Sequence, residues 1–202
     1  MKKALLFICF FLAFSAFVSA QSAEEYFKRG NSKYLANDLP GALRDYSSSI
    51  SLKPNQPETY CNRGHVQELL KNYTAALEDY NAAINLDPKY AEAFLKRGLL
   101  YFNQKNLKAA IADFNKAITI RPNYDKAYNN RGLVNYELKD YRNALADYDQ
   151  ALKINPQFTD AYYNRGAARY NLKDRTGACS DWETAQKQGS SAAAKMKRQY
   201  CR

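Results

Sequence analysis

The stretch that decides the fold is residues 91–124, which read AEAFLKRGLLYFNQKNLKAAIADFNKAITIRPNY. In its first half, large apolar side chains from Phe94 to Phe102 recur at the three- and four-residue spacing of one helix face. A polar turn follows at 104–106, and the second half returns to the same spacing. Pro122 then ends the pattern, because proline disrupts the interior of a helix. The stretch therefore predicts two helices joined by a short turn.

The same pattern returns every 34 residues, in five units that share one register. Each unit has an Arg-Gly pair in its first half, and an alanine, an aspartate and an adjacent aromatic residue in its second half. The glycines are Gly30, Gly64, Gly98, Gly132 and Gly166; the alanines are Ala42, Ala76, Ala110, Ala144 and Ala178; the aspartates are Asp45, Asp79, Asp113, Asp147 and Asp181; the aromatic residues are Tyr46, Tyr80, Phe114, Tyr148 and Trp182; and four units close at Pro54, Pro88, Pro122 and Pro156. A fixed period of this length indicates a helical repeat protein. The small residues predict that the two helix axes of a unit approach closely.

These residues resemble the tetratricopeptide repeat family, from residue 23 to about residue 189. The resemblance implies an all-α fold, a tetratricopeptide-type α-solenoid in which five helix–turn–helix repeats form a right-handed superhelix. It also implies a role in protein–protein contacts. The expected repeats are 23–56, 57–90, 91–124, 125–158 and 159–189. Because a solenoid must cover its last apolar face, residues 190–202 are expected to form a capping helix and tail.

The sequence departs from the family at the residue before each glycine, where arginine replaces the common leucine. An arginine guanidinium suits a two-pronged contact with a carboxylate, and every unit also has its aspartate. We therefore predict a ladder of Arg–Asp pairs, within units or across neighbours. The competing interpretation is a coincidence of surface charges, each worth less than about 1 kcal/mol. The arginines are Arg29, Arg63, Arg97, Arg131 and Arg165.

The first 20 residues predict export. Two lysines precede an apolar run over residues 4–18, and small side chains follow up to Ala20. This is the layout of a secretory signal peptide, of bacterial type in its lysine-rich start, with cleavage after Ala20. The alternative is a retained membrane anchor, although a spanning helix needs roughly 20 apolar residues. The protein is expected to be periplasmic or secreted.

The cysteines fit an oxidising compartment. Cys179 lies in the last second helix and Cys201 follows the expected cap, so a bridge between them would hold the cap on the last repeat. Cys61 is expected to be a partly buried small hydrophobic residue, with a dimer-forming or reactive thiol as the alternative.

Catalytic, metal and cofactor sites are not predicted. His65, the one histidine of the chain, lies four residues after Cys61, and two ligands fall short of the three or four of a zinc site. The net charge of +10 is compatible with acidic peptides, anionic lipid or cell-wall polymer, or with an ordinary solvated surface. Export argues against nucleic acid. The protein is expected not to be an enzyme.

Binding is expected in the concave groove, which the first helices line in the resembled family. An asparagine-rich and aromatic lining follows by that resemblance. The candidate groove residues are Asn31, Tyr34, Asn62, His65, Lys96, Leu99, Phe102, Asn129, Asn130, Leu133, Tyr136, Tyr163 and Asn164, with Phe27, Cys61, Leu95 and Tyr170 beside them. Asparagine side chains can hold an extended peptide backbone, since each both donates and accepts hydrogen bonds. The alternative for the aromatic residues is packing between adjacent repeats.

One family subtype binds a carboxy-terminal carboxylate with a clamp of asparagines and basic residues. Asn31, Asn62 and Lys96 stand at clamp positions, but Phe27 and Glu92 replace the two expected lysines. The clamp is incomplete and is not predicted. The leading hypothesis is an exported scaffold that binds a protein or peptide. The alternative is a structural envelope protein that contacts cell-wall polymer or another anionic surface through its basic face. The sequence defines neither the partner's identity nor the oligomeric state.

Overall fold

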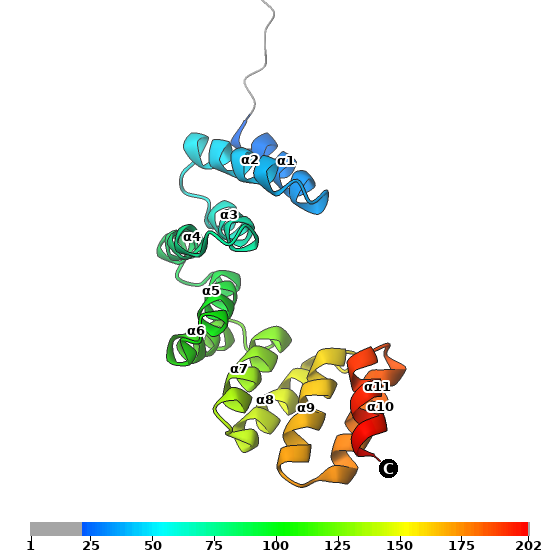
Figure 1. The fold of residues 1–202 in the computed structure, drawn as a ribbon. Helices are drawn as coiled ribbons and strands as arrows, with labels where there is room; N and C mark the ends of the chain where they lie inside the picture. Colours follow the sequence, from blue (N-terminus) through cyan, green and yellow to red (C-terminus); the bar gives the residue numbers. More distant parts are fainter. Residues whose placement is uncertain (1–21, 202) are drawn as a thin grey trace, which may run out of the picture.

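The computed structural model describes residues 22–201, and over that range the chain forms eleven α-helices and no strand (Figure 1). The helices are α1 (Ala23–Leu35), α2 (Leu39–Leu52), α3 (Pro57–Leu69), α4 (Tyr73–Leu86), α5 (Ala91–Asn103), α6 (Leu107–Ile120), α7 (Asp125–Glu137), α8 (Tyr141–Ile154), α9 (Thr159–Asn171), α10 (Arg175–Lys187) and α11 (Ser191–Tyr200). The expected all-α solenoid is confirmed. The predicted signal peptide, residues 1–20, lies outside the described residues.

The helices stack as hairpins along a curved path. Each odd-numbered helix from α1 to α9 packs against the helix that follows it, and each hairpin packs on the next. The first helices of neighbouring hairpins also touch, as α3 does α5, α5 does α7 and α7 does α9. Figure 1 shows α4 and α6 on the outer side of the arc relative to α3 and α5. The first helices therefore line the inner, concave side.

Every hairpin turn uses the same backbone device. One residue in the left-handed region, with φ between 60° and 69°, ends the first helix, and an aspartate or asparagine follows it. In four of the five described turns that side chain accepts a hydrogen bond from the second helix's first turn, which satisfies a free N–H group there. The left-handed residues are Asn37, Lys71, Lys105, Lys139 and Lys173.

The repeated glycine makes room for the second-helix aromatic ring of its own unit. A Cβ atom added at Gly98 would lie 2.7 Å from Cε1 of Phe114, and the other four units show the same conflict at 2.6 to 3.0 Å. The repeated alanine beside it, Ala110 in this unit, is fully buried. The ring and the small residues together set the close packing of each hairpin, so a glycine inside a helix is tolerated despite its cost of about 1 kcal/mol.

The Arg–Asp ladder is confirmed in all five units. In each unit the Nε and Nη2 groups of the arginine donate to the aspartate 16 residues later, at 2.5 to 3.1 Å. In units two to five the Nη1 group reaches back to a polar side chain of the preceding unit. These acceptors are Ser47, Asn81, Asn115 and Asp149. The Arg–Asp pairs of the ladder therefore lie within units, and the contact with the preceding unit goes to a different polar side chain. One arginine thus joins its own unit and its neighbour.

The ladder is partly buried, which gives it energetic weight. The aspartate side chains are 3 to 7% exposed and the arginine side chains 16 to 40%. Each guanidinium also lies over the aromatic ring three residues before it, at 4.8 to 5.6 Å from the ring centroid. The contacts with Arg29 and Lys33 lower the pKa of Asp45 to about 2, whereas burial outweighs the Arg63 contact and raises the pKa of Asp79. Surface ion pairs worth less than about 1 kcal/mol do not describe this arrangement.

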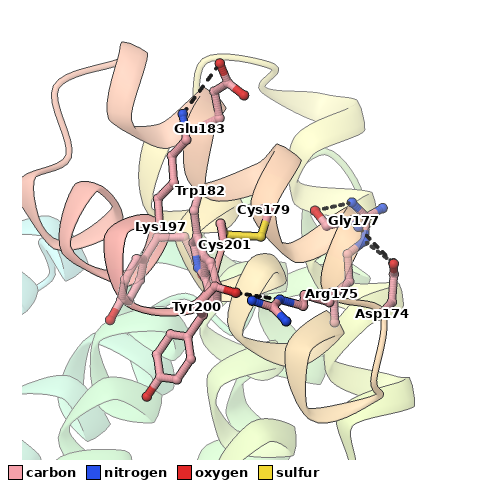
Figure 2. The surroundings of a disulfide bond; sticks show 11 residues. Asp174, Arg175, Gly177, Cys179, Trp182, Glu183, Lys197, Tyr200 and Cys201 are labelled. Carbon is pink, nitrogen blue, oxygen red and sulfur yellow. Dashed lines mark hydrogen bonds and ion pairs between the residues drawn. A yellow bond between two sulfur atoms is a disulfide. The ribbon is translucent and has the colours of Figure 1, made fainter.

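The last hairpin is closed by α11. Cys179 and Cys201 form a disulfide with a Cα–Cα distance of 5.7 Å, as the sequence predicts (Figure 2). The Tyr200 ring lies 4.7 Å from that of Tyr170 and 6.0 Å from that of Trp182, between centroids. Closing a loop of 22 residues contributes about 3 kcal/mol in the chain-entropy account. Covalent and aromatic contacts thus hold the cap together.

Replacing Arg97 by leucine, the residue common in the family, tests the ladder. The Asp113 carboxylate would stay buried without its partner, and we expect a loss of about 3 kcal/mol in the free energy of unfolding in urea. Adding Asp113→Asn should restore at least half of that loss, because the buried charge is gone. The exposed Arg142 offers the matched control Arg142→Leu, expected to change stability by less than about 0.5 kcal/mol. Equal stability of Arg97→Leu and the native chain would contradict the buried ladder.

Candidate binding groove

The predicted groove residues lie on the first helices α1, α3, α5, α7 and α9, whose contacts place them on the concave side. Most are half-buried. Cys61, Leu95 and Asn129 occupy the same position in successive repeats and are 0%, 3% and 5% exposed, so the expectation that these side chains line the groove surface is wrong. Cys61 belongs to a buried cluster with Ala93 and Leu100 of the next first helix. Leu95 shares its cluster with residues of α7 in the same way. This helix position is covered by the following repeat.

The thiol of Cys61 is buried and is not a reactive nucleophile. Burial raises its pKa to about 12, so the thiolate is strongly disfavoured. Among residues 22–201 no three His, Cys, Asp or Glu side chains are grouped to hold a metal ion. Within the same range no helix is long and apolar enough to cross a bilayer.

The groove begins with a pocket between α1 and α3. Its volume is about 330 Å³, and its lining combines uncharged polar groups with exposed apolar surface. The lining residues are Asn31, Tyr34, Leu35, Tyr46, Asn62 and His65. The Tyr34 hydroxyl hydrogen bonds with Nε2 of His65 at 3.1 Å, and their rings are 5.6 Å apart between centroids. Of these six, Leu35 and Tyr46 were not among the predicted groove residues.

Burial controls the charge of this pocket. It lowers the pKa of His65 to about 4, with a smaller contribution from the positive charge of Lys96. The imidazole is therefore neutral at physiological pH. Its Nδ1 atom is buried and has no hydrogen-bond partner in the described part of the chain. A single buried polar atom of this kind costs about 1–3 kcal/mol.

The asparagines of the groove hydrogen bond to one another in two groups. At the α1–α3 end, the Asn31 Oδ1 atom accepts from the Tyr46 hydroxyl at 2.6 Å and from Asn62 Nδ2 at 3.2 Å. At the far end, Asn164 Nδ2 donates to Asn129 Oδ1 at 3.0 Å. Asn129 is only 5% exposed, since α9 covers it. These pairs hold the remaining amide groups in fixed directions along the groove.

The middle of the groove carries a charge cluster. Glu92 accepts a short hydrogen bond from the Tyr124 hydroxyl and lies 3.8 Å from the Lys96 ammonium group. The Arg121 guanidinium sits over the Tyr124 ring, 4.4 Å from its centroid. A carboxylate thus occupies a position where the clamp subtype has a lysine. The Glu92 carboxylate offsets part of the positive charge of Lys96 and Arg121 beside it.

Four aromatic residues could either bind a ligand or pack between repeats, and all four contact other side chains of the protein. They are Tyr34, Phe102, Tyr136 and Tyr170. Tyr136 stacks edge-on against Tyr141 at 5.2 Å, and its hydroxyl accepts from Asn171 Nδ2. Phe102 lies under the Lys105 ammonium group at 5.6 Å. Tyr34 contacts His65, and Tyr170 joins the cap cluster while remaining 37% exposed. Each ring is therefore held in place by neighbours and keeps one part at the surface.

Family comparisons match the repeated segment. The model described as TPR repeat matches residues 30–71 and 69–105, and the model described as Tetratricopeptide repeat matches residues 91–124 and 125–158. Taken together the matches extend from residue 30 to residue 158, which is more than half of the chain. None of the curated protein sequences compared with the chain matches it.

Three solved structures illustrate the likeness of shape. The crystal structure of MamA protein is 27% identical, with 82% of this chain and 91% of that chain covered and a TM-score of 0.69. YrrB, described as a TPR protein with an unusual peptide-binding site, is 20% identical, with 88% and 92% covered and a TM-score of 0.67. PilF of Pseudomonas aeruginosa is 17% identical, with 88% and 86% covered and a TM-score of 0.80. The last two show likeness of fold alone.

The neutral state of His65 predicts a pH dependence of stability. The folded pKa of about 4 lies below the ordinary value of 6.5, so the unfolded chain takes up a proton first as pH falls. We expect no contribution to the pH dependence above about pH 7, and a progressive loss of stability from about pH 6.5 down to about pH 4. Urea unfolding of the native chain and of His65→Gln across this range measures it, because the chain has no other histidine. The variant should show a flatter profile, and parallel profiles would contradict a buried neutral imidazole.

Proposed function

We propose that this chain, which belongs to the tetratricopeptide repeat family, is a non-enzymatic scaffold that binds a peptide or an extended segment of a partner protein in its concave groove. Proteins built from these repeats generally mediate protein–protein or peptide contacts. The observation that carries the proposal is the groove lining, where asparagine amides held by mutual hydrogen bonds lie beside half-exposed rings. Such a surface offers donors, acceptors and apolar area to a polypeptide backbone.

Two further observations support a polypeptide ligand. The pocket between α1 and α3 opens into the groove with Leu35 82% exposed at its edge. A concave pocket whose walls combine apolar surface with a few polar groups is typical of a binding site. The similar structure YrrB is described as having a peptide-binding site, although an unusual one. The Glu92 carboxylate, which stands where the clamp subtype has a lysine, supports a ligand whose carboxylate is not the main contact.

Export from the cytoplasm is part of the proposal. Residues 1–20 have the layout of a signal peptide, and the Cys179–Cys201 disulfide is a feature of oxidising compartments. The bridge staples the cap, where a reducing compartment would leave two free thiols. These features support a periplasmic or secreted protein.

A second candidate function is contact with an anionic surface of the cell envelope. Its specific observation is the row of lysines at the hairpin turns, which are exposed and hold left-handed φ angles at 34-residue steps. A non-glycine residue in this region costs of order 1 kcal/mol or more, so four lysines there are not the most stable choice. They are Lys71, Lys105, Lys139 and Lys173. Binding through this edge would be electrostatic.

Photo-crosslinking separates the two candidates. Peptides are first selected on the full chain from a phage-displayed random library, in about 1 M NaCl, where charges are screened beyond about 3 Å. A benzophenone amino acid at Leu99, on the concave side, should crosslink the selected peptides. The same group at the exposed Ala112 of α6 should not. Tyr136→Ala should weaken binding roughly tenfold, whereas Tyr73→Ala, at the 44% exposed Tyr73 of α4, should leave it unchanged.

The position of the crosslink and the retention of peptide at high salt decide between groove binding and binding through the basic edge. Peptides that crosslink at Ala112 as well as at Leu99, or none retained at high salt, would contradict groove binding. Retention of anionic vesicles or polyanions at low salt only, lost on Lys105→Gln and Lys139→Gln, would support the basic edge instead.

Intact mass spectrometry of protein from cells tests export. We expect the mature chain to begin at Gln21 and to lack the mass of two hydrogen atoms relative to the fully reduced form. Treatment with a reductant and an alkylating agent should then modify Cys179 and Cys201. A protein recovered with residues 1–20 attached and all its thiols free would contradict export.

A further inference from the structure

The pocket between α1 and α3 has a narrower chemistry than the groove as a whole. We propose that it takes one uncharged aromatic or branched aliphatic side chain of a bound peptide, together with the adjacent main-chain amide. This inference rests on the proposed function and specifies the anchor of the ligand. It excludes a terminal carboxylate as the group that is held here.

The size and walls of the pocket fit one large side chain. Its volume of about 330 Å³ is at the lower end of the range for small-molecule sites. Tyr34 and His65 form a ring-lined wall across the α1–α3 contact, and their mutual hydrogen bond fixes the two rings. Leu35 stands at the edge with 82% of its surface exposed. An aromatic or branched aliphatic side chain of the ligand would cover Leu35 and remove apolar surface of both groups from water.

No lining group carries a charge near neutral pH. The six residues are two asparagines, two tyrosines, a leucine and a histidine whose burial keeps it neutral. The charged groups that act on His65 are Lys96 and Glu92, and these lie 3.8 Å from each other. Their opposite charges offset one another. A charged ligand group would therefore lose its hydration without gaining an unpaired countercharge, which disfavours a carboxylate or an ammonium group.

The polar side of the pocket matches an amide. The Asn31 Oδ1 atom is occupied by the Tyr46 hydroxyl and by Asn62 Nδ2. This leaves Asn31 Nδ2 as a donor and Asn62 Oδ1 as an acceptor, neither having a partner among residues 22–201. A peptide unit offers one carbonyl and one N–H group, which complement this pair. A carboxylate only accepts, so it would leave the Asn62 oxygen facing another acceptor.

Two probes of nearly equal size test the amide preference on the full chain. N-acetyl-phenylalaninamide carries the ring and two amides, and ionised N-acetyl-phenylalanine replaces one amide by a carboxylate. We expect the amide to shift the NMR signals of the Leu35 methyl groups and the His65 ring in a saturable way. Its affinity should exceed that of the acid at least fivefold. Equal or tighter binding of the acid, or no shift at Leu35, would overturn the inference.

Variants locate the effect without risk to the fold. Leu35→Ala changes an exposed side chain and should weaken the amide probe roughly fivefold, while Leu138→Ala, at a leucine that is 52% exposed and lies in a turn, should not. Asn62→Leu should bring the two probes to similar affinity, because the acceptor is lost. An unchanged preference in Asn62→Leu would show that the asparagine pair does not read the amide and would refute that part of the inference.

The result can be told apart from failure of the proposed function. If selected peptides crosslink at Leu99 while neither probe shifts Leu35, the groove binds peptides and the anchor pocket is wrong. If peptides fail to crosslink at Leu99 and the probes fail as well, both proposals are wrong. Supporting results in both experiments identify the α1–α3 pocket as the anchor.

Discussion

The stack of hairpins depends on the hydrogen bonds made by the arginine before each repeated glycine. One guanidinium binds a buried aspartate of its own hairpin with two hydrogen bonds and, from the second unit on, a polar group of the preceding hairpin with a third. It also lies over an aromatic ring of its own helix. Because the aspartate is almost fully covered, the arginine cannot leave without stranding a charge. Each hairpin is thus closed, and aligned with its neighbour, by the same side chain.

This alignment determines what the concave surface can present. Successive first helices lie close enough for one to cover part of the previous one, which is why Cys61 and Leu95 are core residues. The positions that stay open carry asparagines, tyrosines and His65. The pocket with Leu35 at its edge lies between the first two hairpins. At the opposite end α11 packs on the last hairpin through Tyr200 and the disulfide.

Much of this could be predicted from the sequence, because a 34-residue register repeats each contact five times. The fold, the Arg–Asp pairing and the Cys179–Cys201 bridge all follow from residues at fixed spacing. The left-handed turn residues and the capping aspartates and asparagines obey the same period and could have been found in it. The covering of Cys61 and Leu95 could not, since it depends on the distance between neighbouring helices. In the sequence Leu35 looks like an ordinary apolar residue of a helix, and only its exposure in the structure identifies it as part of the pocket edge.

The central claim is that one arginine joins two repeats, and a double-mutant cycle between Arg97 and Asn81 tests it most directly. These residues belong to different hairpins and are connected by a hydrogen bond from Arg97 Nη1 to Asn81 Oδ1 at 2.5 Å. The stabilities of Arg97→Leu, Asn81→Ala and the double variant, measured by urea unfolding, give the coupling energy. The account predicts a coupling of about 1 kcal/mol or more. Additive effects, within about 0.3 kcal/mol, would contradict it.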